Sequence, residues 1–361
     1  MTMRVCMVSP LPPPYGGISH WTSMIVDHAA SKSDVSMSVI DISPRWRDVH
    51  DTGRMKRAFG GAIQLVRDAL RLFFQLVRRR PHVVHLTTPG GMAVVRDVVM
   101  LGMSKILGIP SVYHIRFGRA PALLADHSGM ESLLFCLACH LASKVIAIDA
   151  ATYVSLTGSG YENKSQLIPN CYNGASLPAS RGGASKVVLY IGWVIPTKGI
   201  AELLDAWKTI ERNDGWRLIL VGPVDAAFKV SLEQHVASTA VSFAGEMAHA
   251  DAMSMLAEAD ILVLPSHSEG FPNVVLEGMA LGKPVLATAV GAIPEMLSDG
   301  AGVVVPAKNT PALSEGLRSL MDDPDRRQLL GRQARVRAQE RYSLDSVFLS
   351  YQALWRSLSR Q

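Results

Sequence analysis

The sequence contains few cysteines and no long apolar run that is free of charge. Only four of its 361 residues are cysteine, which argues against a disulfide-stabilised scaffold. The best candidate for a membrane-spanning helix, residues 133–154, is interrupted by His140, Lys144 and Asp149, so we expect no such helix. The first ten residues, MTMRVCMVSP, lack the pattern of a signal peptide. We therefore expect a cytoplasmic protein.

Two further absences concern nucleotide chemistry. The chain has no GxGxxG loop followed about 20 positions later by an acidic residue, which argues against a nicotinamide dehydrogenase. The Gly-rich segment LPPPYGGISH (11–20) also fails to match GxxxxGK[ST]. Gly16 and Gly17 nevertheless allow a ligand to come close to their backbone amides, and a helix is expected from Ile18. The alternative for this segment is a simple turn.

What the chain does contain is a large apolar fraction and an uneven distribution of charge. Apolar residues make up 48% and charged residues 19%, which suits a packed core, and the length suits two domains. The formal net charge is +5. Residues 1–180 contain 18 Lys and Arg against 11 Asp and Glu, whereas residues 181–361 contain 18 against 20. The basic first half points to an anionic partner.

Short apolar, β-branched runs alternate with helix-like stretches along the whole chain. In the first half, the runs are Arg4–Val8, Val35–Ile42, Val83–Thr88, Ser111–Ile115, Lys144–Ile148 and Gln166–Ile168. In the second half, they are Val187–Gly192, Arg217–Val221, Val241–Ala244, Ile261–Leu264, Pro284–Ala287 and Gly302–Val305. These runs are continuous rather than alternating, as in parallel strands covered by helices on both faces. They predict an α/β protein with two Rossmann-like, doubly wound parallel-sheet domains facing a cleft.

A segment rich in Gly, Ser, Ala and Pro (170–186) separates the two halves and is typical of a linker. We expect an N-terminal domain over residues 1–180 and a C-terminal domain over residues 181–342. Thr310, followed by Pro311, is expected to cap a helix in the C-terminal region. Because ligands of open α/β sheets bind outside the carboxyl ends of the strands, polar residues at those ends are candidates for a site.

Two glutamates, Glu269 and Glu277, lie eight positions apart just after a predicted strand. Asn273 follows Pro272 and is expected to cap a helix that begins at Val274. Carboxylates near such a helix N-terminus can accept paired hydrogen bonds from the hydroxyls of a ribose or a hexose. Alternatively, Glu277 complements the helix dipole and Glu269 is part of a solvated loop. The sequence leaves both interpretations open.

Lys198 and His114 lie at the ends of other predicted strands. Lys198, in YIGWVIPTKG (190–199), is expected to open a helix, where a cation is unfavourable unless an anion such as a nucleoside diphosphate lies beside it. The alternative is an exposed lysine. His114, in YHIRFG, ends a strand of buried character. It is either a satisfied core histidine or a functional group.

Two other motifs are interpreted as structural. Cys136, Cys139 and His140 have the spacing of a c-type haem attachment site, but they lie within an apolar helix-like stretch and are expected in the core. The segment MDDPD (321–325) contains an Asp-x-Asp pair that could suggest a metal site. It lies between two predicted helices, where Asp and Pro are ordinary turn and cap residues.

The region from residue 45 to residue 80 is basic and partly apolar. It ends in RLFFQLVRRR (71–80) and also contains Arg45, Trp46, Arg47, Arg54, Lys56, Arg57 and Arg67. One interpretation is a solvated helix, and the other is a surface that lies on anionic lipid. Nucleic acid is not expected as a partner, because the region lacks the interleaved stacking aromatics of single-strand binders.

Taken together, these motifs resemble the GT-B retaining glycosyltransferases of family 4, the large group 1 set. The pair Glu269 and Glu277 corresponds to the E-x7-E motif of that family. The segments VGAIPEML (290–297), GWVIPTKG (192–199), LIPN (167–170) and the Gly-Gly loop fall where the family has their counterparts. The resemblance covers most of the chain and is densest from residue 186 to residue 306.

The resemblance implies that a nucleoside-diphosphate sugar binds mainly to the C-terminal domain. The catalytic residues that it implies are His114 beside the reacting sugar, Lys198 at the diphosphate and Glu269 at the donor sugar. The other donor-binding positions are Gly16 and Gly17 at the diphosphate, Gly222, Pro223, Glu246 and Met247 beside the nucleoside, Gly270, Phe271, Pro272, Asn273 and Val274 beside the donor sugar, and Glu277 at the ribose hydroxyls.

The resemblance also implies a reaction without a metal or a cofactor, in which backbone amides and a lysine stabilise the leaving diphosphate. The anomeric configuration would be retained, with the leaving phosphate as base. The acceptor would be a lipid-linked glycan or polysaccharide precursor bound by the N-terminal domain at the inner face of a membrane. A final helix, about residues 343–361, would pack back on that domain. Alternatives are a nucleotide-sugar epimerase of the same fold and a non-catalytic partner of another transferase.

One position departs from the family pattern. Many members have an arginine beside the diphosphate where this chain has Trp193. Lys198 is then the obvious cation at the diphosphate, unless Arg116 or Arg119 also reaches it.

Overall fold

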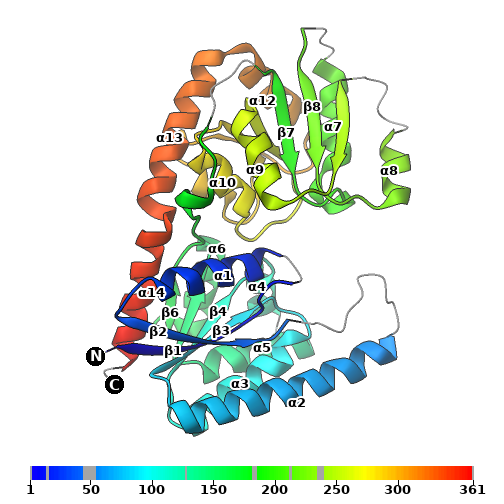
Figure 1. Ribbon diagram of the computed structural model, residues 1–361. Coiled ribbons are helices and arrows are strands. Elements are labelled where there is room, and N and C mark those ends of the chain that lie inside the picture. Colours follow the sequence, from blue (N-terminus) through cyan, green and yellow to red (C-terminus); the bar gives the residue numbers. More distant parts are fainter. Residues whose placement is uncertain are drawn as a thin grey trace. The chain divides into compact units, whose positions relative to one another are not determined.

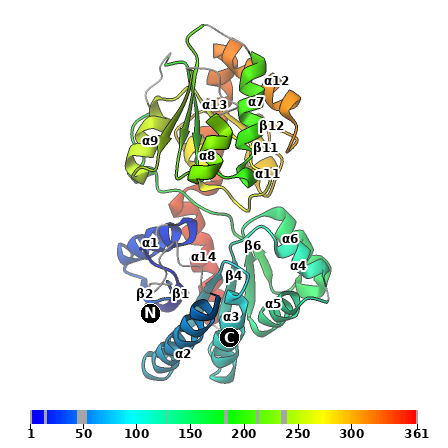
Figure 2. The same ribbon diagram turned by 90° about the vertical axis from the view of Figure 1, so that its right-hand side faces the viewer.

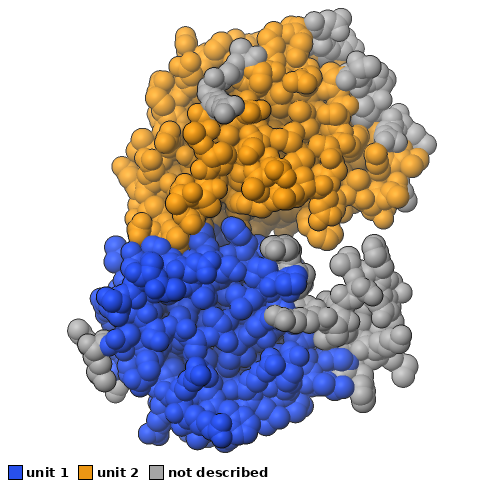
Figure 3. Space-filling view, viewed as in Figure 1, with its two compact units in different colours: residues 1–170, 347–361 blue, residues 171–346 orange. Residues whose placement is uncertain are grey.

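The computed structural model describes residues 2–13, 16–43, 54–126, 128–180, 185–210, 214–233 and 240–359. Of the basic region noted above, Arg45, Trp46 and Arg47 lie outside the described residues, as do the side chains of Arg54, Lys56 and Arg57. The chain forms two compact units (Figure 3). Unit 1 comprises residues 1–170 and 347–361, and unit 2 comprises residues 171–346.

Unit 1 contains a six-stranded parallel sheet with the strand order β2-β1-β3-β4-β5-β6 (Figure 1). The strands are β1 (Met3–Ser9), β2 (Val35–Asp41), β3 (Val83–Thr88), β4 (Ser111–Ile115), β5 (Lys144–Ala147) and β6 (Ser165–Leu167). The α-helices are α1 (Gly17–Ala30), α2 (Arg54–Arg79), α3 (Ala93–Ile106), α4 (Ala120–Ala125), α5 (Met130–Leu141), α6 (Ala150–Leu156) and most of α14 (Leu344–Ser359).

Successive strand residues point to opposite faces of this sheet. Each face is apolar or buried and is covered by its own set of helices. One face, which includes Val8 and Tyr113, packs into a hydrophobic core with Leu72 of α2 and Phe135 of α5. Helices α2 and α3 lie side by side on it (Figures 1 and 2). The opposite face carries buried polar side chains and is covered by α1 and α14, which contact one another through His28 and Phe348.

Unit 2 contains a second six-stranded parallel sheet, with the order β12-β11-β10-β7-β8-β9. Its strands are β7 (Val187–Ile191), β8 (Arg217–Val221), β9 (Val241–Gly245), β10 (Ile261–Leu264), β11 (Val285–Thr288) and β12 (Val303–Val305). Its α-helices are α7 (Ile200–Ile210), α8 (Ala226–Glu233), α9 (His249–Glu258), α10 (Asn273–Ala280), α11 (Ile293–Met296), α12 (Thr310–Asp322) and α13 (Pro324–Tyr342). The predicted pair of doubly wound parallel sheets is thus confirmed.

The chain order in each sheet reverses at one point, and this point decides where a ligand can bind. In unit 1 the reversal lies between β1 and β3, and in unit 2 between β7 and β10. Connections on the two sides of a reversal run to opposite faces, which leaves a crevice outside the carboxyl ends of those two strands. Residues that directly follow β7 and β10 are therefore the best-placed ligand contacts of unit 2.

Two glycines allow the loops at this end of the unit 2 sheet to pack closely. Gly199 has φ +68° and Gly222 has φ +139°, conformations that favour glycine. A Cβ atom at Gly199 would overlap the carbonyl oxygen of Pro265, and one at Gly222 would overlap that of Gly192. The loops after β7, β8 and β10 are thus in direct backbone contact.

Some predicted element boundaries were wrong by one residue. Asn309, not Thr310, caps α12, and its side chain accepts a hydrogen bond from Ala312 N–H at 3.0 Å. A proline in the first turn fits either register, so the sequence pattern did not decide between them. Likewise Asn273 is the first residue of α10 and its N-cap is Pro272, without a side-chain cap bond. Among the described residues, no helix is both long and apolar enough to cross a bilayer.

Candidate functional site

Glu269 and Lys198 form an ion pair at the reversal point of the unit 2 sheet. Lys198 ends a short 3-10 turn, Pro196–Lys198, that follows β7, and Glu269 lies in the loop after β10. Lys198 Nζ is 2.6 Å from Glu269 Oε1, and the two side chains are 24% and 13% exposed. The buried Ser266 hydroxyl donates to the same carboxylate oxygen at 2.6 Å. The anion that the position of Lys198 requires is therefore Glu269, which sequence reasoning had assigned separately.

The loop that carries Glu269 is held by its neighbours in the sheet. The Thr288 hydroxyl, at the end of β11, donates to the carbonyl oxygen of Ser266 at 2.5 Å. Ala292 N–H donates to the carbonyl oxygen of Gly270 at 2.8 Å. Gly291, with φ +54°, lies so close that a Cβ there would overlap the carbonyl oxygens of this loop. The VGAIPEML segment thus supports the backbone on which Glu269 sits.

Glu277 lies in the second turn of α10 and is buried, with 8% of its surface exposed. Its Oε1 atom is 2.8 Å from His249 Nε2, at the first residue of α9. This hydrogen bond raises the pKa of His249, and burial opposes the rise. The predicted role of Glu277 at a ribose is compatible with an oriented carboxylate, but the histidine partner was not predicted. The prediction for the connection after β9 named Glu246 and Met247, and His249 lies two residues beyond them in the same connection.

The remaining predicted donor-binding residues of unit 2 lie in the same loops or at the start of α10. Gly222 N–H donates to the carbonyl oxygen of Gly245 at 2.8 Å, and Val194 N–H donates to that of Pro223 at 2.9 Å. Glu246 is exposed and Met247 is half-buried. Phe271 and Pro272 are buried, whereas Asn273 and Val274 are half-buried at the first turn of α10.

Phe271 is anchored away from solvent. Its ring packs edge-on against Tyr342 of α13, with 5.6 Å between ring centroids. Only its backbone is therefore available to a ligand.

Trp193, at the position that departs from the family pattern, is 59% exposed, and the hydroxyl of Tyr190 donates to its carbonyl oxygen at 2.8 Å. Burial, followed by the nearby Glu269 carboxylate, raises the pKa of Tyr190, which keeps its hydroxyl protonated.

In unit 1, Gly16 and Gly17 lie at the start of α1, just after β1. Both are exposed. The Gly16 amide donates to Ser19 Oγ at 2.9 Å, so it already has a partner within the first turn of the helix. This is one of the two amides that the resemblance assigns to a diphosphate. The predicted helix start at Ile18 is in fact at Gly17.

His114 lies on β4 and is fully buried. Its Nδ1 atom is 3.0 Å from His85 Nε2, and Arg116 Nη1 is 3.4 Å from its Nε2. Burial, with Arg116 and His85 as further causes, holds the pKa of His114 well below its usual range. His114 is therefore neutral and can act only as a hydrogen-bonding group. The His85 partner was not predicted. It lies on the neighbouring strand β3, two residues before Thr87, which is the register partner of His114.

The two arginines considered as additional diphosphate ligands have other contacts within unit 1. The Arg116 guanidinium lies 4.2 Å from the ring centre of Trp21. Arg119 is exposed and pairs with Glu131 at 3.2 Å. Neither is held toward an open anion site by these contacts.

The two motifs interpreted as structural have structural surroundings. Cys139 is buried in the core of unit 1, and Cys136 packs against that core. His140 was also expected in the core, and this was wrong, because it lies exposed in the last turn of α5. Burial raises the pKa of the Cys139 thiol. In the segment MDDPD, Asp323 caps α13, accepting a hydrogen bond from Arg326 N–H at 2.8 Å.

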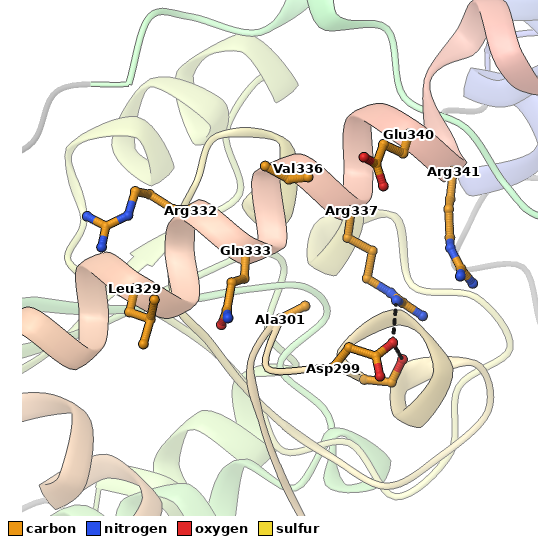
Figure 4. A pocket seen from close by; sticks show the side chains of 10 residues that line it. Asp299, Ala301, Leu329, Arg332, Gln333, Val336, Arg337, Glu340 and Arg341 are labelled. Carbon is orange, nitrogen blue, oxygen red and sulfur yellow. Dashed lines mark hydrogen bonds and ion pairs between the residues drawn. The ribbon is translucent and has the colours of Figure 1, made fainter.

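A cavity of about 360 Å³ lies elsewhere in unit 2, between α13 and the loop before β12 (Figure 4). Three arginines of α13 line it, together with Asp299 and Glu340. One of them, Arg337, donates to Asp299 at 2.9 Å and to the carbonyl oxygen of Glu295 at 2.7 Å. None of the predicted donor-binding residues lines this cavity.

The family model for glycosyl transferases group 1 matches residues 180–337. A relative is the capsular polysaccharide biosynthesis glycosyltransferase CapM of Staphylococcus aureus, 25% identical over 178 residues, which are 48% of this chain and 47% of that protein. The chain spans about half the length of the curated relatives it matches.

Solved structures match the whole chain. Sucrose-phosphate synthase from Thermosynechococcus elongatus has a TM-score of 0.76 and 19% identity, covering 99% of both chains. Anabaena HepE in complex with UDP has a TM-score of 0.74 and 18% identity, covering 99% of this chain and 100% of that one. At such identities the likeness concerns the fold. The chain therefore has a two-domain fold of the GT-B type, and its residues 180–337 match the family model for glycosyl transferases group 1.

Proposed function

We propose that this protein is a glycosyltransferase that uses a nucleoside-diphosphate sugar bound by unit 2. The observation that carries the proposal is the cluster of Lys198, Glu269 and Ser266 at the reversal point of the sheet, inside the segment that matches the family. Open α/β sheets bind their ligands at that point. The similar Anabaena protein holds UDP, which supports a nucleotide as the ligand class.

The proposed roles of Lys198, Glu269 and Glu277 follow from their charges. Lys198 stabilises the negative charge of the departing diphosphate, and preorganised charges of this kind supply a large part of enzymatic rate enhancement. Glu269 accepts hydrogen bonds from hydroxyls of the donor sugar, and Glu277 from those of the ribose. The ion pair between Lys198 and Glu269 keeps both groups in position before the donor arrives, so that neither charge is left unpaired.

The proposed reaction retains the configuration of the donor sugar. The bond between the anomeric carbon and the diphosphate breaks, and a new bond forms from the acceptor oxygen to the same face of that carbon. The acceptor proton passes to a phosphate oxygen of the leaving group. No metal and no cofactor takes part, because Lys198 and backbone amides provide the stabilisation of the diphosphate.

The proposed acceptor is a lipid-linked glycan or a polysaccharide precursor. The CapM relative carries the name of a capsular polysaccharide enzyme, which supports a glycan acceptor. A membrane-bound acceptor is supported by α2 of unit 1. This helix exposes a row of large apolar side chains with helical spacing, namely Ile63, Val66, Leu70, Phe73, Phe74 and Val77.

Helix α2 combines this row with positive charge. The side chains of Arg67 and Arg71 are 43% and 54% exposed, and the helix ends in Arg78 and Arg79. Leu72 and Leu76 are buried in the core on the other side of the helix. An apolar row flanked by arginines fits the interface of an anionic bilayer, where each basic residue adds about 1 kcal/mol of attraction. We therefore propose that α2 lies on the inner face of the cell membrane.

Vesicle binding tests this surface. Wild type should sediment with phosphatidylglycerol vesicles but not with phosphatidylcholine vesicles, and salt should weaken the binding. Leu70→Glu together with Phe74→Glu should abolish it. Val154→Glu, at an exposed apolar position of α6, is the matched control and should bind normally. Binding of the double variant to these vesicles as strong as that of wild type would refute a lipid surface. The same conclusion would follow if light scattering showed wild type to be a dimer and the double variant, but not the control, to be a monomer.

Donor turnover tests the proposed activity. The protein is incubated with UDP-, GDP- and ADP-sugars, with and without a membrane extract of lipid-linked acceptors, and the release of nucleoside diphosphate is measured. We expect release from one donor class that depends on the acceptor. Conversion of the donor sugar without an acceptor would indicate an epimerase instead. Donor binding without turnover on any acceptor would indicate a non-catalytic partner.

A further inference from the structure

Three buried side chains of unit 1 form a hydrogen-bonded chain that runs from the last helix to His114. Trp355 of α14 donates its Nε1–H to His85 Nδ1 at 3.0 Å. His85 Nε2 in turn lies 3.0 Å from His114 Nδ1. Trp355, His85 and His114 are all fully buried. The three rings come from α14, β3 and β4, so residues far apart in sequence are joined in one network.

The chemistry of the three rings permits one arrangement of protons. An indole nitrogen only donates, so His85 Nδ1 must be the acceptor and carries no proton. Neutral His85 therefore has its proton on Nε2 and donates it to His114 Nδ1. His114 must then carry its own proton on Nε2. A doubly protonated His85 would place its Nδ1–H against the Trp355 N–H at 3.0 Å. A doubly protonated His114 would place its Nδ1–H against the His85 Nε2–H at 3.0 Å, which only an anionic His85 without either proton would avoid.

Arg116 does not alter this assignment. A guanidinium group only donates, so the contact of Arg116 Nη1 with His114 Nε2 at 3.4 Å would by itself favour the opposite tautomer of His114. It is the longest contact of the network, and the two contacts at 3.0 Å along the three rings outweigh it. Among the described residues, no other polar partner of His114 Nε2 is found. In this assignment the Nε2–H group faces the Arg116 guanidinium and has no acceptor among the described residues.

We propose that Trp355 is a positioning residue that acts through His85 to hold His114 as a neutral ring with its proton on Nε2. This role rests on the proposed function, in which His114 donates a hydrogen bond to a hydroxyl or phosphate oxygen of the sugar donor. A histidine without this relay would present an unprotonated Nε2 for part of the time. Its Nε2 atom would then offer a lone pair to an oxygen of the sugar donor, which needs an N–H group as its partner.

The surroundings of the pair favour the neutral state. The charged and titratable groups that face it are Arg116, at the end of β4, and Tyr351 of α14, while Trp21 of α1 adds an uncharged ring. Burial, with Arg116 as the second cause, lowers the pKa of His85 to about 3. The relay should thus persist across the whole neutral range.

Nitrogen NMR of histidine-labelled protein tests the assignment without any measurement of activity. In wild type, both rings should show a protonated Nε2 and an unprotonated Nδ1 at pH 7, with no change down to pH 5.5. A His114 ring with its proton on Nδ1, or either ring as a cation, would overturn the inference. This result also stands apart from the proposed function, because it needs neither donor nor acceptor.

Two variants of α14 test the role of Trp355. Trp355→Phe keeps a ring but removes the donor, so the His85 and His114 spectra should show mixed proton positions. In the transfer assay its kcat should fall about tenfold, the cost of one hydrogen bond of about 1.4 kcal/mol, with little change in KM for the donor.

The matched control is Phe348→Leu, which loses aromatic packing on the same helix but no hydrogen-bond donor. It should lower the midpoint of thermal unfolding and leave the histidine spectra as in wild type. Equal spectra for wild type and Trp355→Phe would refute the positioning role. If Trp355→Phe does not fold, the wild-type spectra alone still decide the assignment. Correct spectra without transfer activity would reject the proposed function and keep the relay.

Discussion

Both units carry polar side chains on a parallel sheet, but the side chains in question are charged in unit 2 and neutral in unit 1. In unit 2, Lys198 and Glu269 are charged, partly exposed and paired with each other at the carboxyl ends of β7 and β10. In unit 1, His85 and His114 are fully buried and neutral, and they are joined to an indole. The difference shows how each group is made available. A paired charge can be exchanged for a charged ligand, whereas a neutral ring can only donate or accept one hydrogen bond.

The largest expected effect comes from removing the cation of unit 2. Lys198→Met should lower kcat by about 10²- to 10³-fold, the typical loss for a preorganised group that stabilises transition-state charge. Unpaired Glu269 would then also repel the diphosphate. Lys208→Met, at an exposed position of α7, is the control and should retain full activity. Steady-state kinetics with the preferred donor measure both, and a loss of less than about threefold would contradict the proposed role of Lys198.

The buried histidines of unit 1 should make the protein less stable in acid. Because the pKa of His85 is lowered to about 3, the unfolded chain binds a proton below its own pKa of about 6.5 while the folded protein does not. Stability is then fully present above about pH 6.5 and falls as the pH drops, by about 2 kcal/mol for this residue at pH 5.

Thermal unfolding at pH 7, 6 and 5 measures this loss. A His85→Leu variant should have a flatter pH dependence, because that residue no longer binds a proton on unfolding. His140→Gln, at an exposed position, should behave as wild type. A pH dependence of His85→Leu as steep as that of wild type would show that this residue does not contribute.

A smaller effect is expected from Glu277→Gln. The amide keeps the shape of the carboxylate but loses its charge and one of its acceptor sites, so the affinity for the nucleotide should fall about tenfold. Titration calorimetry with the preferred nucleoside diphosphate measures the change. Glu315→Gln, at an exposed position of α12, should bind as wild type. Unchanged affinity in Glu277→Gln would leave Glu277 with only its contact to His249.

The smallest effect is expected from His249→Gln. The pKa of His249 is raised by its hydrogen bond to Glu277, so its stabilising contribution is present below its ordinary pKa and is lost as the pH rises through the raised value. His249→Gln should therefore weaken nucleotide binding a few-fold at pH 6 and less at pH 9. A pH dependence of the opposite sign would show that the imidazolium does not support the carboxylate.

The sequence predicted the sheets because their strands are continuous apolar runs. It indicated Lys198 and Glu269 as candidate site residues because strand ends are identifiable, and their roles stay predictions. It did not predict that these two side chains pair across 71 positions, since the strand order is not visible in the pattern. The contact of Trp355 with His85 spans 270 positions and depends on where α14 packs. No local signal in the sequence identifies such a partner.

The remaining differences have local causes. Asn309 and Thr310 are both good capping residues, so the sequence could not choose between them. The exposed apolar row of α2 became visible only with the structure. The apolar residues of this helix lie on more than one side of it, and their spacing alone does not show which side is buried. Leu72 and Leu76 point into the core, and their apolar neighbours at Phe73 and Val77 do not.

The most direct test of the central claim is thermal unfolding with about 1 mM UDP, GDP, ADP or NAD, on wild type, Glu277→Gln and Glu315→Gln. A ligand present at 100 times its dissociation constant adds about 2.7 kcal/mol of stability. The account predicts that one nucleoside diphosphate raises the midpoint of wild type and of Glu315→Gln, and that Glu277→Gln loses most of the rise. A shift with NAD alone, or no shift with any nucleotide, would contradict a nucleotide-sugar site in unit 2.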